Sequence, residues 1–423
     1  MRQRRETGIV NPTTASHRIA ALAFIGGLGG GLVFPILPAL GLRLGIPTFM
    51  IGLILSANRI ARLIFNVPAG LVSGTLGPRA VLGGALFVEG SGVLCYSAAL
   101  HLGHPTWWLL GGRALFGIGT AFLMVGSIAA ALSLSDKADR GRTIASVRVA
   151  MSAAMPGGLI VGGILADIFS DDIAFLTGAG ITLAGALLAV LILPRTLRRA
   201  DAESAGHAQR GRFAALLRSP NLRFLAAAWG FNLLIFLTMQ GILLATMVVL
   251  VQRRGIHLFG MQAQGISGLM MAVLIGCSAF AAYFMGRVID SAPLRATLVI
   301  PSLLALAAGF GIFAAAQSLP LMLLGAVTIG LSYNGVTLPM LALLGDAATE
   351  SQHGAAVGVY QFFGDIGGTI GPIVGIEVGV KVGLEPLYFS IAALIAVTLP
   401  IAVWLRHHES RAQTIHHRIA KAS

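Results

Sequence analysis

The sequence predicts an all-α membrane protein in which 12 transmembrane helices form two pseudo-symmetric six-helix bundles. Of its 423 residues, 56% are hydrophobic and only 11% are charged, whereas soluble domains carry about 25% charged residues. Apolar runs long enough to cross about 30 Å of hydrocarbon recur along the whole chain. Short motifs in the first half of the chain recur in the second half. The composition and the apolar runs exclude a water-soluble fold, and the recurring motifs predict two related halves.

Each predicted span is an apolar run of roughly twenty residues or more, the length at which a helix crosses a bilayer. The first run is longer than the apolar region of a secretory signal, so we expect it to be retained as a span. The predicted spans cover residues 19–42, 47–70, 79–101, 106–132, 144–167, 173–194, 224–251, 265–288, 295–316, 319–345, 355–380 and 385–405.

A polar stretch from Arg195 to Arg223 separates the first six spans from the last six. This spacing predicts a division of the chain into four parts. They are an N-terminal six-helix bundle over 1–195, a cytoplasmic linker over 196–222, a C-terminal six-helix bundle over 223–406 and a cytoplasmic tail over 407–423.

The distribution of basic residues predicts the orientation of the chain in the membrane. Lys and Arg on the termini and on alternate loops outnumber those on the opposite loops by 21 to 4. Because basic loops stay in the cytoplasm, both termini are expected there. The net charge of +13 therefore reflects topology rather than nucleic acid binding. The preference for Arg over Lys is typical of a GC-rich bacterial genome, which favours the bacterial inner membrane, or an internal membrane derived from it, as the location.

Two kinds of motif recur six spans apart. A pattern of glycine and basic residues follows the second and eighth spans, and a glycine pattern lies in the fifth and eleventh spans. Many secondary transporters are duplicated bundles with the solute site between the two repeats. The motif residues are Gly70, Gly77, Arg79, Gly286, Asp290, Arg295, Gly158, Gly162, Gly371 and Pro372.

With these motifs the chain resembles the major facilitator superfamily over essentially its full length. The loop after the second span in that family reads roughly G-x-x-x-D-x-x-G-R-R. Gly70, Gly77 and Arg79 match it, but Gly74 stands at the acidic position. The resemblance implies the twelve-helix fold of that family and a gating role for the ten motif residues. In the family the acidic residue helps to latch the two bundles, so its loss here puts the N-terminal latch in doubt.

The fourth and fifth spans carry the remaining similarity to the family. The family's fourth-span motif, R-x-x-q-G-x-g, is matched by Arg113, Gly117 and Gly119. The fifth-span motif G-P-x-x-G-G, which is associated with exporters of the antiporter groups, is matched by Gly158 and Gly162 without its proline. This fifth-span match favours efflux over uptake.

Of the ionisable residues inside predicted spans, four are candidates for ion coupling: Arg59, Arg62, Glu89 and Asp365. A charge in the bilayer costs about 2.5–3.5 kcal/mol on insertion scales, so each is a functional candidate. The resemblance implies that the second span borders the eleventh, so we expect Arg59 or Arg62 to pair with Asp365 in one conformation. Glu89 is the alternative partner. A carboxylate that gains and loses a cation suits a proton-coupled step, whereas a static buried ion pair is the alternative interpretation.

The resemblance also implies a cavity lined by the first, fourth, seventh and tenth spans. Candidate substrate-binding residues on these spans are Arg113, Asn232, Gln240, Tyr333 and Asn334. No acidic residue lies in the middle of these four spans, so an anionic or neutral polar solute is favoured over a cation. Amide side chains also form hydrogen bonds between membrane helices, and this alternative stays open.

Together these features predict a secondary active transporter that moves a small solute by alternating access, with a proton gradient as the energy source. No cofactor, metal or nucleic acid is expected, and the expected partners of the monomeric chain are the solute and the lipid bilayer. The sequence has no P-loop lysine and no H-E-x-x-H motif, so neither a primary pump nor an enzyme is predicted. A transporter-like scaffold or sensor without net flux, and an uptake or uniport carrier, remain as alternatives.

Overall fold

A computed structural model describes residues 12–134, 140–193, 221–258, 260–292, 294–348 and 352–422 of the chain. The described part contains 12 helices long and apolar enough to cross a membrane, which confirms the predicted fold class. Their bounds agree with the predicted spans to within a few residues, except that the last is longer. The predicted cytoplasmic linker at 196–222 lies outside the described residues, apart from its last two.

The chain forms two compact units. Unit 1 comprises Met1–Gly45 and Ala57–Ala202, and unit 2 comprises Ile46–Ser56 and Glu203–Ser423. The first turns of the second span are thus grouped with unit 2, whereas the rest of this span belongs to unit 1.

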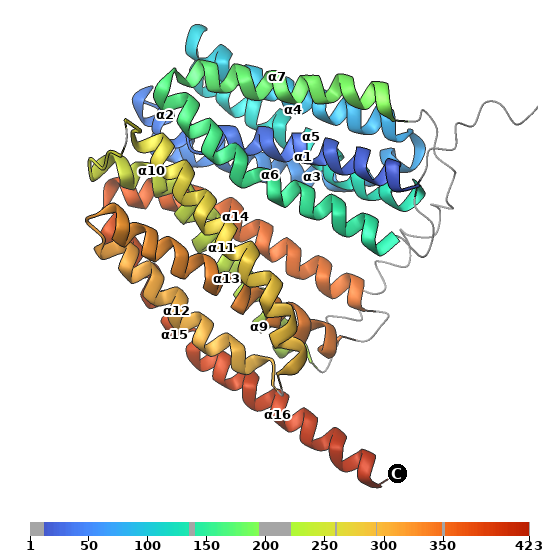
Figure 1. Cartoon of the computed structure of the whole chain (residues 1–423). Coiled ribbons are helices and arrows are strands. Elements are labelled where there is room, and N and C mark those ends of the chain that lie inside the picture. Colours follow the sequence, from blue (N-terminus) through green and yellow to red (C-terminus); the bar gives the residue numbers. More distant parts are fainter. Residues whose placement is uncertain are drawn as a thin grey trace, which may run out of the picture. The chain divides into compact units, whose positions relative to one another are not determined.

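Seven helices carry the first six spans (Figure 1). The first span is broken after Val33, where Pro35 and Pro38 interrupt the helical hydrogen bonds. In unit 1, α1 packs against α5, α6 and α7, and α4 packs against α5 and α7. The helices are α1 (Pro12–Val33), α2 (Leu37–Arg43), α3 (Thr48–Thr75), α4 (Pro78–His101), α5 (Pro105–Leu134), α6 (Arg140–Ile168) and α7 (Asp171–Ile192).

The last six spans contain two interrupted helices. The seventh span changes from α to π geometry in its middle, and the twelfth is interrupted at Thr398 beside Pro400. In unit 2, α14 packs against α9 and η1, and α13 packs against α11 and α12. The elements are α9 (Leu222–Ile235), η1 (Phe236–Leu243), α10 (Leu244–Arg253), α11 (Ala263–Ser291), α12 (Ala296–Ala315), α13 (Leu319–Ala347), α14 (His353–Lys381), α15 (Leu384–Val397) and α16 (Leu399–Ala422).

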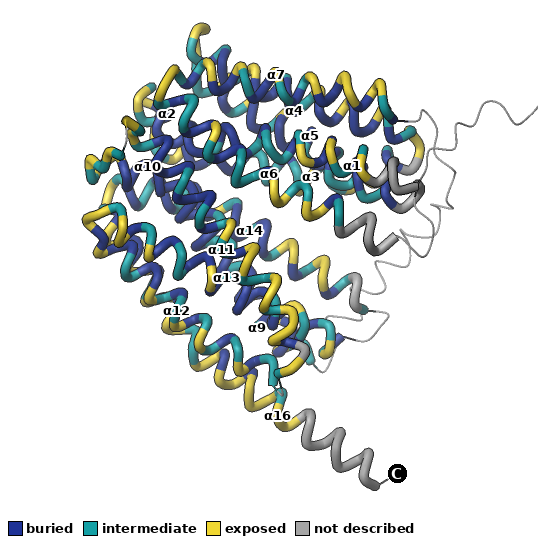
Figure 2. Tube along the Cα trace, viewed as in Figure 1, coloured by how far each residue is buried: buried dark blue, intermediate teal, exposed yellow. Residues whose placement is uncertain are grey.

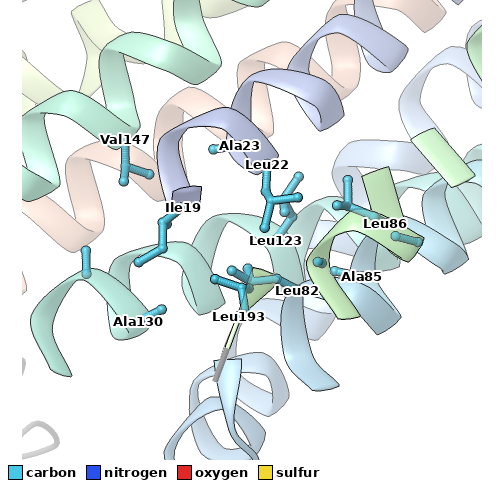
Figure 3. Close-up of a cluster of buried hydrophobic side chains, with 13 residues drawn as sticks. Ile19, Leu22, Ala23, Leu82, Ala85, Leu86, Leu123, Ala130, Val147 and Leu193 are labelled. Atoms are coloured by element: carbon cyan, nitrogen blue, oxygen red, sulfur yellow. The ribbon is translucent and has the colours of Figure 1, made fainter. Parts of the chain in front are cut away.

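The core of unit 1 lies where α1, α4, α5, α6 and α7 meet. Small and large apolar side chains interdigitate there, with Leu22, Leu82 and Leu123 fully buried (Figure 3). The outward faces of the same helices carry exposed apolar residues, and α7 alternates between buried and exposed positions along its length (Figure 2). Exposed apolar side chains on a spanning helix are suited to contact lipid tails.

Glycines bring one pair of helices into close contact in each unit. A Cβ atom at Gly158 of α6 would lie 2.9 Å from the Cα of Gly31 in α1. In unit 2, a Cβ at Gly241 of η1 would lie 2.5 Å from the Cα of Gly371 in α14. Small residues allow membrane helices to approach this closely. The fifth and eleventh spans therefore use their glycine patterns in the same way, each against the first span of its own unit.

Candidate functional site

The carboxylate of Glu89 lies in the interior of unit 1, where α1, α4 and α5 meet. Glu89 is only 1% exposed. Its Oε1 atom lies 2.8 Å from the hydroxyl oxygen of Thr120 on α5. Its Oε2 atom has no hydrogen-bond partner, and no cation forms an ion pair with it among the described residues. For Glu89, the structure therefore shows no buried ion pair of the kind that the sequence left open as an alternative.

Glycines of two neighbouring helices make the space that the Glu89 side chain occupies. A Cβ at Gly26 of α1 would lie 2.9 Å from the Oε2 atom of Glu89. A Cβ at Gly119 of α5 would lie 2.5 Å from the Cγ atom of Glu89. Gly119 belongs to the fourth-span motif noted in the sequence, and it leaves room for the backbone of α4 as well as for the Glu89 side chain.

Arg113, a predicted substrate-binding residue, lies on α5 and is 2% exposed. Its guanidinium carbon is 5.7 Å from the centre of the Phe34 ring, which lies at the break in the first span. This is a cation–π distance. The fully buried Tyr96 of α4 lies within electrostatic range of both Arg113 and Glu89. The α4–α5 contact of unit 1 therefore contains an acid, a phenol and a guanidinium.

Two members of this cluster, Tyr96 and Thr120, were missed from the sequence because neither is charged. Their spacing carries a signal, since Tyr96 follows Glu89 by seven residues and Thr120 follows Arg113 by seven. Seven residues are close to two helical turns, so each pair shares one helix face. A search for polar side chains at this interval from a buried charge would have found both.

The other ion-coupling candidates are divided between the units. Arg59 and Arg62 are half-buried on the part of α3 that belongs to unit 1. Asp365 lies on α14 in unit 2 and is 6% exposed. The Thr369 hydroxyl one turn later donates to the backbone carbonyl of Asp365 at 2.7 Å. The expected pairing of Asp365 with Arg59 or Arg62 stays a prediction.

Two predicted substrate-binding amides form hydrogen bonds between helices of unit 2. The Asn334 amide on α13 donates to the Ser278 carbonyl at 2.7 Å and lies 2.9 Å from the Ser278 hydroxyl on α11. The Asn232 amide on α9 donates to the Tyr360 carbonyl of α14 at 2.6 Å. Its Oδ1 atom is buried without a hydrogen-bond partner. Asn334 thus acts in helix packing in this conformation, whereas Asn232 keeps one acceptor available.

The remaining substrate-binding candidates, Gln240 and Tyr333, are half-buried. Gln240 lies in the π-helical segment η1, and the Tyr333 ring on α13 is 6.5 Å from the ring of Phe236. No residue pattern in the sequence predicted the π segment. Such segments are frequent at functional sites, and this one places Gln240 one residue before the glycine that contacts α14.

The basic gating candidates interact with helix ends. Arg79 donates from Nε to the Leu193 carbonyl at 2.8 Å, at the end of α7. Arg295 forms a 2.5 Å ion pair with Asp346, and its backbone N–H donates to Glu409 at 2.9 Å. A cation at a helix C-terminus is favourable because of the partial charge there. Arg79 therefore caps the end of α7, whereas Arg295 links the start of α12 to Asp346 near the end of α13.

The glycine, proline and aspartate gating candidates occupy several kinds of position. Gly70 and Gly286 are exposed, and Gly77 precedes the first residue of α4. Gly158 and Gly162 contact α1, Gly371 contacts η1, and Pro372 is buried inside α14. The side chain of Asp290 lies outside the described residues. A gating role for this set stays a prediction.

In the part of the chain that the structure describes, no group of three or more His, Cys, Asp or Glu residues is placed to hold a metal ion.

The sequence matches the Major Facilitator Superfamily over residues 19–290 and 259–421, which together cover nearly the whole chain. Among curated proteins, the inner membrane transport protein YajR of Escherichia coli (strain K12) is 25% identical over 197 residues, or 46% of this chain. The bacillibactin exporter of Bacillus subtilis (strain 168) is 30% identical over 95 residues, or 22% of this chain. The aligned regions span 42% and 24% of these two relatives.

Solved transporter structures share the fold. The nucleoside transporter NupG has a TM-score of 0.77 and 14% identity, covering 92% of this chain and 98% of its own. A bacterial homolog of the human lysosomal transporter Spinster has a TM-score of 0.72 and 12% identity, covering 95% of this chain and 98% of its own. The sequence match, the twelve spans and these structures agree. The chain belongs to the major facilitator superfamily of membrane transporters.

Proposed function

We propose that this chain exports a small anionic or neutral polar solute in exchange for protons, by alternating access. The observation that carries proton coupling is that each unit has a buried carboxylate away from the ends of a span, Glu89 at 1% and Asp365 at 6% exposure. Buried carboxyl groups inside membrane spans are expensive to ionise and are typical of proton relays. The proton gradient would supply the energy, and no cofactor takes part.

The nature of the solute is inferred from the positive charge inside unit 1. Arg113 is buried on α5 beside the aromatic ring of Phe34. Guanidinium groups bind carboxylate and phosphate groups well. The buried amide of Asn232 adds an acceptor suited to a polar solute. Export is supported by the fifth-span glycine pattern and by the similarity to a bacillibactin exporter over 22% of the chain.

We also propose a bacterial inner membrane location, or an internal membrane derived from it, with a monomeric chain and both termini in the cytoplasm. The excess of Lys and Arg on the terminal side supports this orientation. The similarity to an inner membrane transport protein of Escherichia coli supports the location. No nucleic acid is expected to bind.

Proton movement in proteoliposomes tests the proposed function. The purified chain is reconstituted with a trapped pH-sensitive dye, and pools of anionic and neutral polar solutes are added in turn. We expect at least one pool to drive proton movement that protein-free liposomes do not show. Solute flux without proton movement would favour a uniporter and overturn proton coupling. The absence of both proton movement and solute flux with every pool would favour a scaffold or sensor without net flux.

A further inference from the structure

We infer that Glu89 is the proton-binding site of the coupled step, and that the glycine face of α1 controls access to it. This inference rests on the proposed proton coupling. It assigns the bound proton to a site inside unit 1, where α1, α4 and α5 converge, whereas Asp365 in unit 2 keeps its predicted role in coupling without carrying this proton.

The first argument is a count of hydrogen atoms at Thr120. The Thr120 hydroxyl oxygen lies 2.8 Å from Oε1 of Glu89 and 2.9 Å from the backbone carbonyl oxygen of Phe116. A threonine hydroxyl has one hydrogen to donate, and both the carbonyl and an ionised carboxylate can only accept. Both contacts become hydrogen bonds when Glu89 is the neutral acid. Glu89 then donates to Thr120, and Thr120 donates to Phe116.

The second argument is the absence of compensation for a negative charge. Oε2 of Glu89 is buried without a donor, and no described cation forms an ion pair with the carboxyl group. A buried charge without a cation or a full set of donors is strongly unfavourable. The surroundings of Glu89 therefore favour a bound proton in this conformation, in agreement with the hydrogen count.

The groups around Glu89 come from α4, α5 and α1. Tyr96 of α4 lies within electrostatic range of both Glu89 and Arg113 of α5. From α1 the contact is Gly26, and a Cβ at Gly119 of α5 would lie 2.5 Å from Cγ of Glu89. Arg113 is thus the charge that would stabilise an ionised Glu89 if the two groups approached each other.

The third argument is the position of Oε2 against α1. A Cβ at Gly26 would lie 2.1 Å from a methyl group of Leu123, 2.9 Å from Oε2 of Glu89 and 3.3 Å from a methyl group of Leu86. The oxygen is thus covered by a glycine surface of the first span, whose helix is interrupted a short distance away after Val33. A movement of α1 would uncover this oxygen to water without disturbing the hydrogen bond to Thr120. Such a movement would let the proton exchange in one conformation and trap it in another.

Infrared difference spectroscopy tests the site without a known solute. The full chain in lipid is transferred from H₂O to D₂O at constant pH, and the C=O stretch of protonated carboxylic acids is followed, because it shifts on deuteration. We expect an exchanging band that E89Q removes, that D365N leaves in place and that T120V moves to a new frequency. An exchange spectrum that E89Q leaves unchanged would overturn the inference, as would the absence of any exchanging acid.

Two controls keep the result interpretable. Glutamine retains the size of Glu89 and an acceptor for Thr120, and E89D restores an acid if E89Q folds poorly. Gly26→Ala should change the exchange rate of the band, whereas Gly111→Ala, on α5 with open space around it, should not. Proton flux on the same samples separates the two claims. Coupled flux that persists in E89Q refutes the Glu89 site alone, and an exchanging band without flux in the wild type refutes the proposed function alone.

Discussion

Thr120 of α5 lies 2.8 Å from the Glu89 carboxyl group of α4 and is its only hydrogen-bond partner among the described residues. Thr120→Val should therefore destabilise the protein by about 0.6 kcal/mol, the average for hydrogen bonds between membrane helices, and by at most about 1.7 kcal/mol. Thermal unfolding in detergent checks this value. Thr120→Ser, which keeps the hydroxyl, should stay closer to the wild type. Equal effects of the two variants would show that the fit of the side chain at this position, rather than the hydrogen bond, determines the loss.

Gly119 lies directly against the Glu89 side chain. Gly119→Ala would place a Cβ 2.5 Å from Cγ of Glu89 and 2.7 Å from the Ala85 carbonyl oxygen. Overpacking of this kind costs about 1–3 kcal/mol, so the midpoint of thermal unfolding should fall. Gly111→Ala on the same helix meets open space and should leave the midpoint unchanged. A similar loss in both variants would indicate a general intolerance of α5 to alanine.

The contact between Gly241 and Gly371 gives a second steric prediction, in unit 2. Gly371→Ala should force η1 and α14 apart and reduce stability by about 1–3 kcal/mol. Gly358→Ala is a matched control, because Gly358 lies on the same helix without any neighbouring atom within 4 Å. Unfolding curves of the two variants, recorded side by side, check the prediction. A wild-type midpoint for Gly371→Ala would show that the two helices are free to separate.

Adjacent arginines at the end of α10 cap two other helices, and their burial differs. Arg254 is 6% exposed, donates to the Ala314 carbonyl at 2.8 Å and lies 3.6 Å from Glu385. Burial lowers the pKa of the Arg254 guanidinium, and Glu385 partly offsets this effect. Arg253 is exposed and donates to the Gly379 and Val380 carbonyls at 3.2 and 3.1 Å.

Arg254→Ala should therefore destabilise unit 2 more than Arg253→Ala, because it leaves buried helix-end carbonyls without a donor. Chemical unfolding of the two variants measures the difference. Arg254→Lys should recover only part of the loss, since an ammonium group lacks the planar fork of a guanidinium. An Arg253→Ala effect as large as that of Arg254→Ala would contradict the dependence on burial.

The fold could be predicted from the sequence because each spanning helix is recognisable from its length and hydropathy. A run such as 79–101 needs no knowledge of its neighbours to be recognised, and α4 covers nearly the same residues. Interruptions inside spans were harder to predict. Prolines lie at the breaks near Val33 and Thr398, whereas no residue pattern predicted the π geometry of Phe236–Leu243.

The candidate site was only partly predictable, since the sequence shows charges but not their partners. Glu89 and Arg113 stand out as ionisable residues in apolar runs. That Thr120 and Gly26 contact Glu89 is known only from the packing of α1, α4 and α5. Asn334 illustrates the reverse case. Its amide resembles a solute contact in the sequence, and the structure shows it bonded to Ser278 of a neighbouring helix. Long-range partners of this kind cannot be read from local spacing.

Solute-driven proton movement in proteoliposomes tests the central claim most directly, with wild type, D365N and E385Q compared. Glu385 is 55% exposed and lies at the start of α15, so E385Q controls for the removal of one carboxylate. We predict that at least one anionic or neutral polar solute drives proton movement in the wild type and in E385Q, and that D365N folds but loses it. Proton movement that D365N retains in full would contradict the coupling role of Asp365. No solute-driven proton movement in the wild type would contradict proton-coupled transport itself.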